Sequence, residues 1–202
     1  MGNLVDYKEI YEREHQESSG YKINNWGLCA AKFWSCFFEF SSVIEVGCGN
    51  GKLLDALVAM NKVCTGVDVV EGIYKRQGYS YFSRDISKDK LPFADKHFDL
   101  GISFDVFEHL ADADFAIREL LRVSKAQIIA VPHSKSFSEK ARYELHLIVK
   151  PADWWLKKLV SISGSSDWIS IGLRRYENGI WREVPANQAR HRTLYLHGVK
   201  DR

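Results

Sequence analysis

Three alternating glycines after a short apolar run constrain this chain more than any other stretch. Residues 43–54 have the sequence VIEVGCGNGKLL. Its first four residues have the apolar character of a strand buried on both faces, and the segment from Lys52 onward has helical spacing. Glycines between the two allow a sharp turn and let a ligand approach bare main chain. A strand, a glycine turn and a helix start predict a binding site for a nucleotide-type cofactor.

The spacing of this turn excludes two common nucleotide motifs. A dinucleotide fingerprint needs a third glycine where this chain has Lys52, and a phosphate-binding loop needs a hydroxyl residue where it has Leu53. What remains is Glu45 followed by a G-x-G-x-G turn. The next apolar run ends on Asp68, whose carboxylate, about 20 residues past the turn, suits two ribose hydroxyls.

These residues resemble the class I S-adenosylmethionine-dependent methyltransferases, and in particular the methyltransferase-11-like small-molecule enzymes. The likeness extends over roughly residues 43–159. Later landmarks of the family follow in the family's order: Asp85-Ile86, Leu91-Pro92-Phe93, Phe98-Asp99-Leu100 and Phe107-Glu108-His109-Leu110. The resemblance therefore implies an enzyme that binds S-adenosyl-L-methionine.

The resemblance also implies a set of cofactor contacts. The glycine turn and its acidic neighbour would line the methionine and ribose, Asp68 would bind the ribose hydroxyls, and Val69 and the 85–86 pair would meet the adenine. A tyrosine in an N-terminal helix often reaches the cofactor in such enzymes, although Tyr11 is equally compatible with packing. The implied contacts are Glu45, Gly47, Cys48, Gly49, Gly51, Asp68, Val69, Asp85, Ile86, Phe104 and Tyr11.

The predicted fold is an α/β, Rossmann-like sheet of seven mostly parallel strands, with helices on both faces and an antiparallel final hairpin. We expect N-terminal capping helices, one domain over residues 1–202, a helical cap over 1–40, and a cofactor-binding core over 41–202 with a substrate-side insert at about 133–165. Strands are predicted at 79–82, 98–104, 127–131, 168–171 and 193–196, and helices after 112–114 and from Pro151.

The second crossover is unusually short. Residues 69–78 leave too little chain for a full helix with its loops, because a parallel crossover needs about a dozen residues. This shortened form resembles the subgroup that includes the methionine-biosynthesis protein W family.

Two histidines are candidates for catalysis. His133 follows the fifth predicted strand at the edge where open α/β sheets bind ligands, and it is either a general base or a loop hydrogen-bonding residue. His109 follows the fourth strand, where a structural or cofactor-side role competes with base catalysis. A further histidine, His146, precedes the Pro151 helix in a region that forms substrate walls in relatives.

Composition narrows the remaining classes. The chain of 202 residues is 46% hydrophobic, with a net charge of +2. Its four cysteines have no C-x-x-C spacing and no metal-ligand pattern is present, so we expect reduced thiols, no metal and a cytoplasmic location. No apolar run reaches membrane-spanning length. The sequence leaves the oligomeric state open.

We therefore predict methyl transfer to a small-molecule acceptor, such as a sugar or another metabolite. Two alternatives stay open. The segment from residue 171 onward contains seven basic and three acidic residues. This basic excess keeps a nucleic-acid acceptor as an alternative that is not favoured. The other is a regulatory protein that retains the cofactor fold without turnover.

Overall fold

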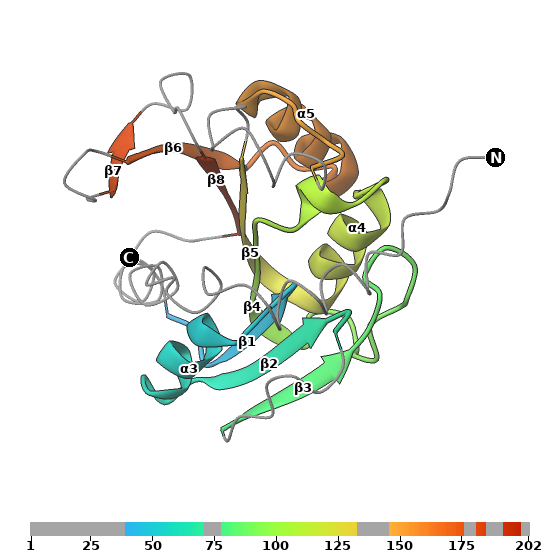
Figure 1. The fold of residues 1–202 in the computed structure, drawn as a ribbon, viewed down its shortest axis with the longest axis vertical. Helices are drawn as coiled ribbons and strands as arrows, with labels where there is room; N and C mark the ends of the chain where they lie inside the picture. The colour runs from blue at the N-terminus through green and yellow to red at the C-terminus, as the bar shows by residue number, and fades with distance from the viewer. Residues whose placement is uncertain (1–38, 71–77, 133–145, 176–180, 185–191, 199–202) are drawn as a thin grey trace.

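The computed structural model describes residues 39–70, 78–132, 146–175, 181–184 and 192–198. These residues form one twisted sheet with helices on both faces (Figure 1). The expected N-terminal cap lies outside them, and the single-domain assignment over the whole chain stays a prediction. The elements are β1 (Ser42–Val46), α3 (Lys52–Val58), β2 (Val63–Asp68), β3 (Tyr79–Ser83), β4 (Phe98–Phe104), the 3-10 helix η2 (Phe107–His109), α4 (Asp114–Val123), β5 (Ser124–Pro132), α5 (Ala152–Ser163), β6 (Ile169–Arg175), β7 (Trp181–Val184) and β8 (Arg192–His197).

The strand order is β3-β2-β1-β4-β5-β8-β6-β7. The first five strands pair in parallel, whereas β8 pairs antiparallel with both β5 and β6. This confirms the predicted seven-stranded sheet with its antiparallel end. The described residues add one strand that the sequence analysis missed, the short edge strand β7, which pairs with β6. Its four residues are too few to show a clear period-2 pattern.

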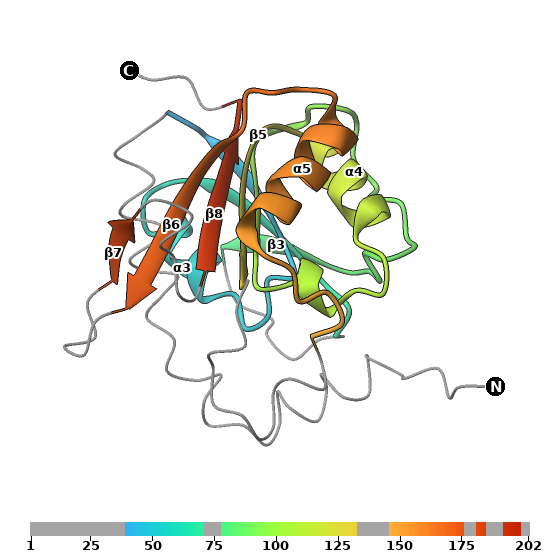
Figure 2. The same ribbon diagram turned by 90° about the horizontal axis from the view of Figure 1, so that it is seen from above.

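Two apolar cores lie on opposite faces of the sheet. Alternate residues of a strand point to opposite faces, so Val43 packs toward α3 and the adjacent Ile44 toward α4 and α5. Both residues are fully buried, as expected for a strand covered on both sides. Figure 2 shows α4 and α5 together on one side of the sheet, away from α3.

Helix α4 runs directly into β5, which begins three residues earlier than predicted. Ser124 is already extended, and its hydroxyl donates to the Leu120 carbonyl at 2.5 Å. This hydrogen bond closes the helix end, so no separate loop is needed. Helix α5 begins one residue later than predicted, at Ala152, so Pro151 is its N-cap and not its first helical residue.

Arg122 of α4 is hydrogen-bonded to the loop that leads into β4. It donates to both carboxylate oxygens of Glu119, from Nε at 2.7 Å and from a terminal nitrogen at 2.8 Å. It also donates to the carbonyls of Leu91 and Phe93, at 2.9 and 2.7 Å. These bonds give the Leu-Pro-Phe landmark a structural role at the edge of the sheet opposite the glycine turn. Among the helices of the described ranges, none combines the length and apolar character that crossing a membrane requires.

Candidate functional site

The glycine turn lies at the carboxyl end of β1, between that strand and α3. Gly47, Gly49 and Gly51 have φ values of 74°, 50° and 69°, a left-handed conformation that residues with a Cβ rarely adopt. The N–H groups of Gly47 and Cys48 donate to the Val67 carbonyl at 2.7 and 3.1 Å, which ties the turn to β2. A Cβ on Gly47 would overlap both methyl groups of Val106, so packing as well as backbone conformation requires glycine there.

Asp68 ends β2 beside this turn. One carboxylate oxygen accepts from the Gly49 N–H at 2.8 Å, and the other accepts from the Val70 N–H at 3.2 Å. Each carboxylate oxygen has two lone pairs, so both oxygens retain acceptor capacity for a ligand. The position matches the rule that open α/β sheets bind ligands beyond the carboxyl ends of their strands.

Glu45 is a buried acid at the same edge. Glu45 is 6% exposed, and its Oε2 atom has no hydrogen-bond partner among the residues that the structure describes. Burial, and to a smaller extent the negative charge of Asp68, raise the pKa of the Glu45 carboxyl well above its usual range. A buried acceptor without a partner is costly, so a ligand donor at this position relieves an existing penalty.

Other residues that were predicted to contact the cofactor lie on both faces of the sheet. Cys48 is buried in the core on the α3 side, where burial, Asp68 and Glu45 raise the pKa of its thiol. Phe104 packs partly buried against the same core, and Ile86 is buried on the opposite face of the sheet. Val69 follows Asp68, and its carbonyl accepts from the Ser83 hydroxyl at 3.3 Å.

Asp85 has a local structural role. Its carboxylate accepts from the Ser87 hydroxyl at 2.6 Å and from the Ser87 N–H at 3.0 Å, and it pairs with Lys88 at 2.9 Å. Although burial opposes the shift, these groups together lower the pKa of the Asp85 carboxyl. The carboxylate thus caps the turn after β3. Its predicted contact with a cofactor stays a prediction.

Beyond β4, the chain forms a cluster that sequence reasoning did not assemble. His109 Nε2 lies 3.6 Å from a carboxylate oxygen of Glu108, and its ring centroid lies 4.6 Å from that of His146. Glu108 is fully buried. The two histidines are far apart in sequence and show no local ligand spacing, so only the tertiary structure pairs them. Of the two catalytic candidates, His109 lies in this cluster, whereas His133 and the cofactor candidate Tyr11 lie outside the described residues.

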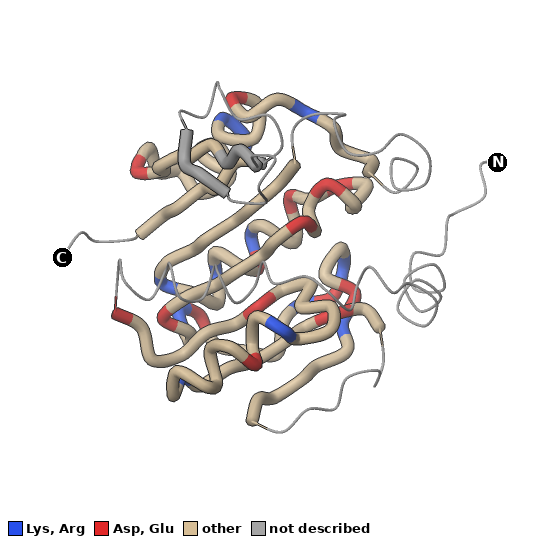
Figure 3. The backbone as a smooth tube through the Cα atoms, turned by 60° about the vertical axis from the view of Figure 1, so that its left-hand side comes forward, with Lys and Arg blue, Asp and Glu red and all other residues tan. Residues whose placement is uncertain are grey.

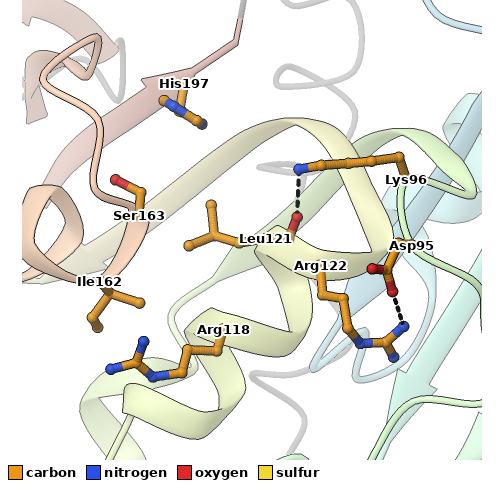
Figure 4. A pocket seen from close by; sticks show the side chains of 8 residues that line it. All are labelled: Asp95, Lys96, Arg118, Leu121, Arg122, Ile162, Ser163 and His197. Atoms are coloured by element: carbon orange, nitrogen blue, oxygen red, sulfur yellow. Dashed lines mark hydrogen bonds and ion pairs between the residues drawn. The ribbon is translucent and has the colours of Figure 1, made fainter.

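A cavity of about 340 Å³ opens at the opposite edge of the sheet (Figure 4). Lys96, Arg118 and Arg122 give it a basic lining, but protein groups already hold two of these cations. Lys96 donates to the carbonyls of Leu121 and Ser124, and Arg122 makes the contacts given above. This cavity lies away from the carboxyl ends of the parallel strands, where such sheets bind ligands, so we place the candidate site at the glycine turn.

Comparison with known proteins points to one kind of domain. Residues 44–131, which cover β1 to β5, match the model of a family described as a methyltransferase domain. The ubiquinone biosynthesis O-methyltransferase of Rhizobium leguminosarum is 34% identical over 80 residues, covering 36% of this chain and 32% of that protein. The ajmaline N-methyltransferase of Rauvolfia serpentina is 32% identical over 118 residues, covering 48% of this chain and 40% of that protein.

A structural relative spans more of the chain. A chain from the complex between the Haloferax volcanii Trm112 methyltransferase activator and a methyltransferase superposes with a TM-score of 0.64 at 16% identity, covering 92% of this chain and 96% of that one. At this identity the likeness shows the fold. This chain spans between 32% and 55% of the length of the first curated relatives it matches.

Proposed function

We propose that this chain transfers a methyl group from S-adenosylmethionine to a small-molecule acceptor, because residues 44–131 match the model of a methyltransferase domain. The observation that carries the proposal is the pair of carboxylates, Glu45 and Asp68, beside the left-handed glycine turn. Both retain acceptor capacity at the edge where such sheets bind ligands.

These residues fit the cofactor. When bound, S-adenosylmethionine supplies an electrophilic methyl group on a positively charged sulfonium. Asp68 would accept hydrogen bonds from the ribose hydroxyls, while the unpartnered Oε2 of Glu45 and the glycine turn would line the methionine and ribose. The negative charge of the Asp68 carboxylate near a cationic cofactor also offsets its charge, an electrostatic match that strengthens where water is excluded.

Catalysis by the protein itself would consist mainly of positioning. Aligning an acceptor with the reacting methyl group can contribute about 7–11 kcal/mol to lowering the barrier. A general base adds a further factor of about 10²–10⁴ for a hydroxyl or amine acceptor. His109 and His133 remain our candidates for that base, and the cofactor contacts through Val69, Ile86, Phe104 and Tyr11 remain proposals.

A small-molecule acceptor is supported by the two relatives named above, a ubiquinone biosynthesis O-methyltransferase and an ajmaline N-methyltransferase. Lys and Arg are interspersed with Asp and Glu along the described backbone (Figure 3), so the described residues give no separate support for a nucleic-acid acceptor. A structural relative that occurs in a complex with the Trm112 activator suggests an activator of this type as a partner. Cytoplasmic location stays a prediction.

The first test is calorimetric titration of the purified chain with S-adenosylmethionine and with its demethylated product. We expect micromolar binding that Asp68→Asn weakens at least tenfold, or about 1.4 kcal/mol. Asp167→Asn is the matched control, since this exposed carboxylate lies in the loop after α5. Urea unfolding of each variant verifies that the fold is intact.

If folded wild-type protein binds neither compound, the proposed function is wrong. Equal binding by the wild type and Asp68→Asn would remove Asp68 from the cofactor site. With binding established, acceptors are screened by product mass, and the mass gain of one methyl group identifies the substrate.

A further inference from the structure

Three side chains with metal-binding atoms converge just beyond the carboxyl end of β4. Glu108 and His109 belong to η2, and His146 lies in the segment that leads into α5. Taking one carboxylate oxygen and one ring nitrogen from each histidine, the three atoms all lie within 4.8 Å of one another. No metal was predicted from the sequence, because these three residues show no local ligand spacing.

Backbone hydrogen bonds hold the two contributing segments together. The Glu108 carbonyl accepts from the N–H groups of Leu147 and Ile148 at 2.7 and 2.9 Å. His146 directly precedes Leu147, so these two hydrogen bonds also place the His146 ring beside that of His109. The cluster is therefore fixed by main-chain contacts as well as by side-chain packing, which favours a preorganised ligand set.

The cluster is enclosed. Glu108 is fully buried, the His109 side chain is 16% exposed, and His146 is partly buried. Surface acids and histidines meet by chance, but a carboxylate buried beside two imidazoles is a more selective arrangement. Two histidines and one carboxylate are the ligand set of many catalytic zinc sites and of the facial triad that binds other first-row divalent metals.

We propose that Glu108, His109 and His146 bind a divalent transition-metal cation such as Zn²⁺. A cation with ligands at about 2.0–2.2 Å brings them to about 3–3.5 Å from one another, so a pair at the 4.8 Å limit closes by about 1.3–1.8 Å on binding. The 3.6 Å separation of Glu108 and His109 is already close to that value. Three protein ligands leave at least one coordination position open.

The position of the cluster suggests what the open position does. Val106, the N-cap of η2, lies against Gly47 of the glycine turn, so the cluster borders the proposed cofactor site. A hydroxyl group on the cation would have a lowered pKa. The acceptor's O–H bond would break with its proton passing to bulk water and its electron pair staying on oxygen. That oxygen would then form a bond to the methyl carbon as the carbon–sulfur bond of the cofactor breaks, and the electron pair of that bond would leave on sulfur. This role, an oxygen acceptor held by the cation, rests on the proposed function, whereas the cation site does not.

The test uses the chelator-treated chain of 202 residues, titrated with ZnCl₂ in a calorimeter. We expect one equivalent to bind the wild type, and the affinity to fall at least hundredfold in His146→Ala and in Glu108→Gln. His97→Ala is the matched control, because His97 is exposed and stacks on Phe93 away from the cluster. Since Glu108 is buried and its variant can fail to fold, the partly exposed His146 keeps the test decisive.

A second readout reports the ligands directly. Co²⁺ in the site should give visible absorption bands that His146→Ala abolishes and His97→Ala retains. Acetohydroxamate, an oxygen-donor probe, should shift these bands by entering the open position. An unchanged spectrum with the probe would overturn the acceptor role, and Zn²⁺ binding that His146→Ala leaves intact would overturn the site.

Titration with S-adenosylmethionine separates this inference from the proposed function. His146→Ala should bind the cofactor as the wild type does. Cofactor binding without stoichiometric Zn²⁺ binding refutes the metal site and leaves methyl transfer standing. Zn²⁺ binding without cofactor binding refutes methyl transfer and supports the site.

Discussion

Replacing Gly47 by alanine tests whether packing, in addition to backbone conformation, shapes the glycine turn. Gly47 has a φ of 74°, and the position of a Cβ there lies 2.9 Å from one Val106 methyl carbon and closer still to the other. Gly164, the C-cap of α5, has nearly the same φ of 69°, but a Cβ there would meet nothing within 4 Å. The two glycines therefore differ mainly in the space beside them.

The expected magnitudes follow from this difference. A left-handed conformation costs an L-residue about 1–2 kcal/mol, and this cost applies to Gly47→Ala and Gly164→Ala alike. Overpacking against Val106 adds about 1–3 kcal/mol for Gly47→Ala alone. The entropy lost by the unfolded chain is the same for both substitutions and cancels in the comparison. Gly47→Ala should thus be less stable than Gly164→Ala by about 1–3 kcal/mol.

Urea unfolding followed by circular dichroism measures both free energies, and an unchanged slope with denaturant shows that the unfolded state is comparable. Adding Val106→Ala to Gly47→Ala removes the overlapping methyl groups and should recover most of the extra loss in a double-mutant cycle. Equal destabilisation by the two glycine substitutions, or no coupling with Val106, would refute the packing argument.

Two further predictions concern acids at opposite edges of the sheet. Because the folded pKa of Glu45 is raised, stability should fall as pH rises from about 4.3, the ordinary glutamate pKa, toward the folded value. Urea unfolding at pH 5 and pH 8 should show a weaker decline for Glu45→Gln, and identical declines would contradict this. Asp99 accepts from the Ser41 and Ser42 N–H groups at 2.9 and 3.0 Å and from Lys125 at 2.9 Å, which together hold its pKa well below the ordinary range. Asp99→Asn should lose about 1–3 kcal/mol at pH 7, and wild-type protein should lose this contribution as pH falls below about 3.9; equal urea midpoints at pH 7 would count against it.

Much of the fold was predictable because its signals are local. The apolar run of β1, the glycine turn and the leucines of α3 each show their period within a few residues, and the structure confirms all three. The parallel strands β2, β4 and β5 were also predicted, since buried strands have continuous apolar runs. The edge strand β3 was predicted as well, although it is only partly buried. The early start of β5 was missed because it depends on Ser124 closing α4, a contact that a sequence period does not encode.

The candidate site divides in the same way. Glu45, Asp68 and the glycines were predicted from their order along the chain, and the structure places them at one edge of the sheet. The sequence could not show that the Asp68 carboxylate accepts a hydrogen bond from the Gly49 N–H. It also could not show that Glu45 has a buried oxygen without a hydrogen-bond partner among the described residues. Both depend on where β1 and β2 end relative to each other, which their pairing register sets.

The sequence by itself determined the element types, the buried faces of the strands and the glycine turn, because backbone conformation and burial follow from residues that are near neighbours in the chain. Only the tertiary structure brought His146 to Glu108 and His109, and Asp99 to Ser41 and Ser42 at the start of β1. Such pairings join distant segments and depend on the packing of the whole sheet and its helices. For that reason the glycine turn and its two acids could be recognised in the sequence as a proposed cofactor site, whereas the proposed cation site could be recognised only in the folded chain.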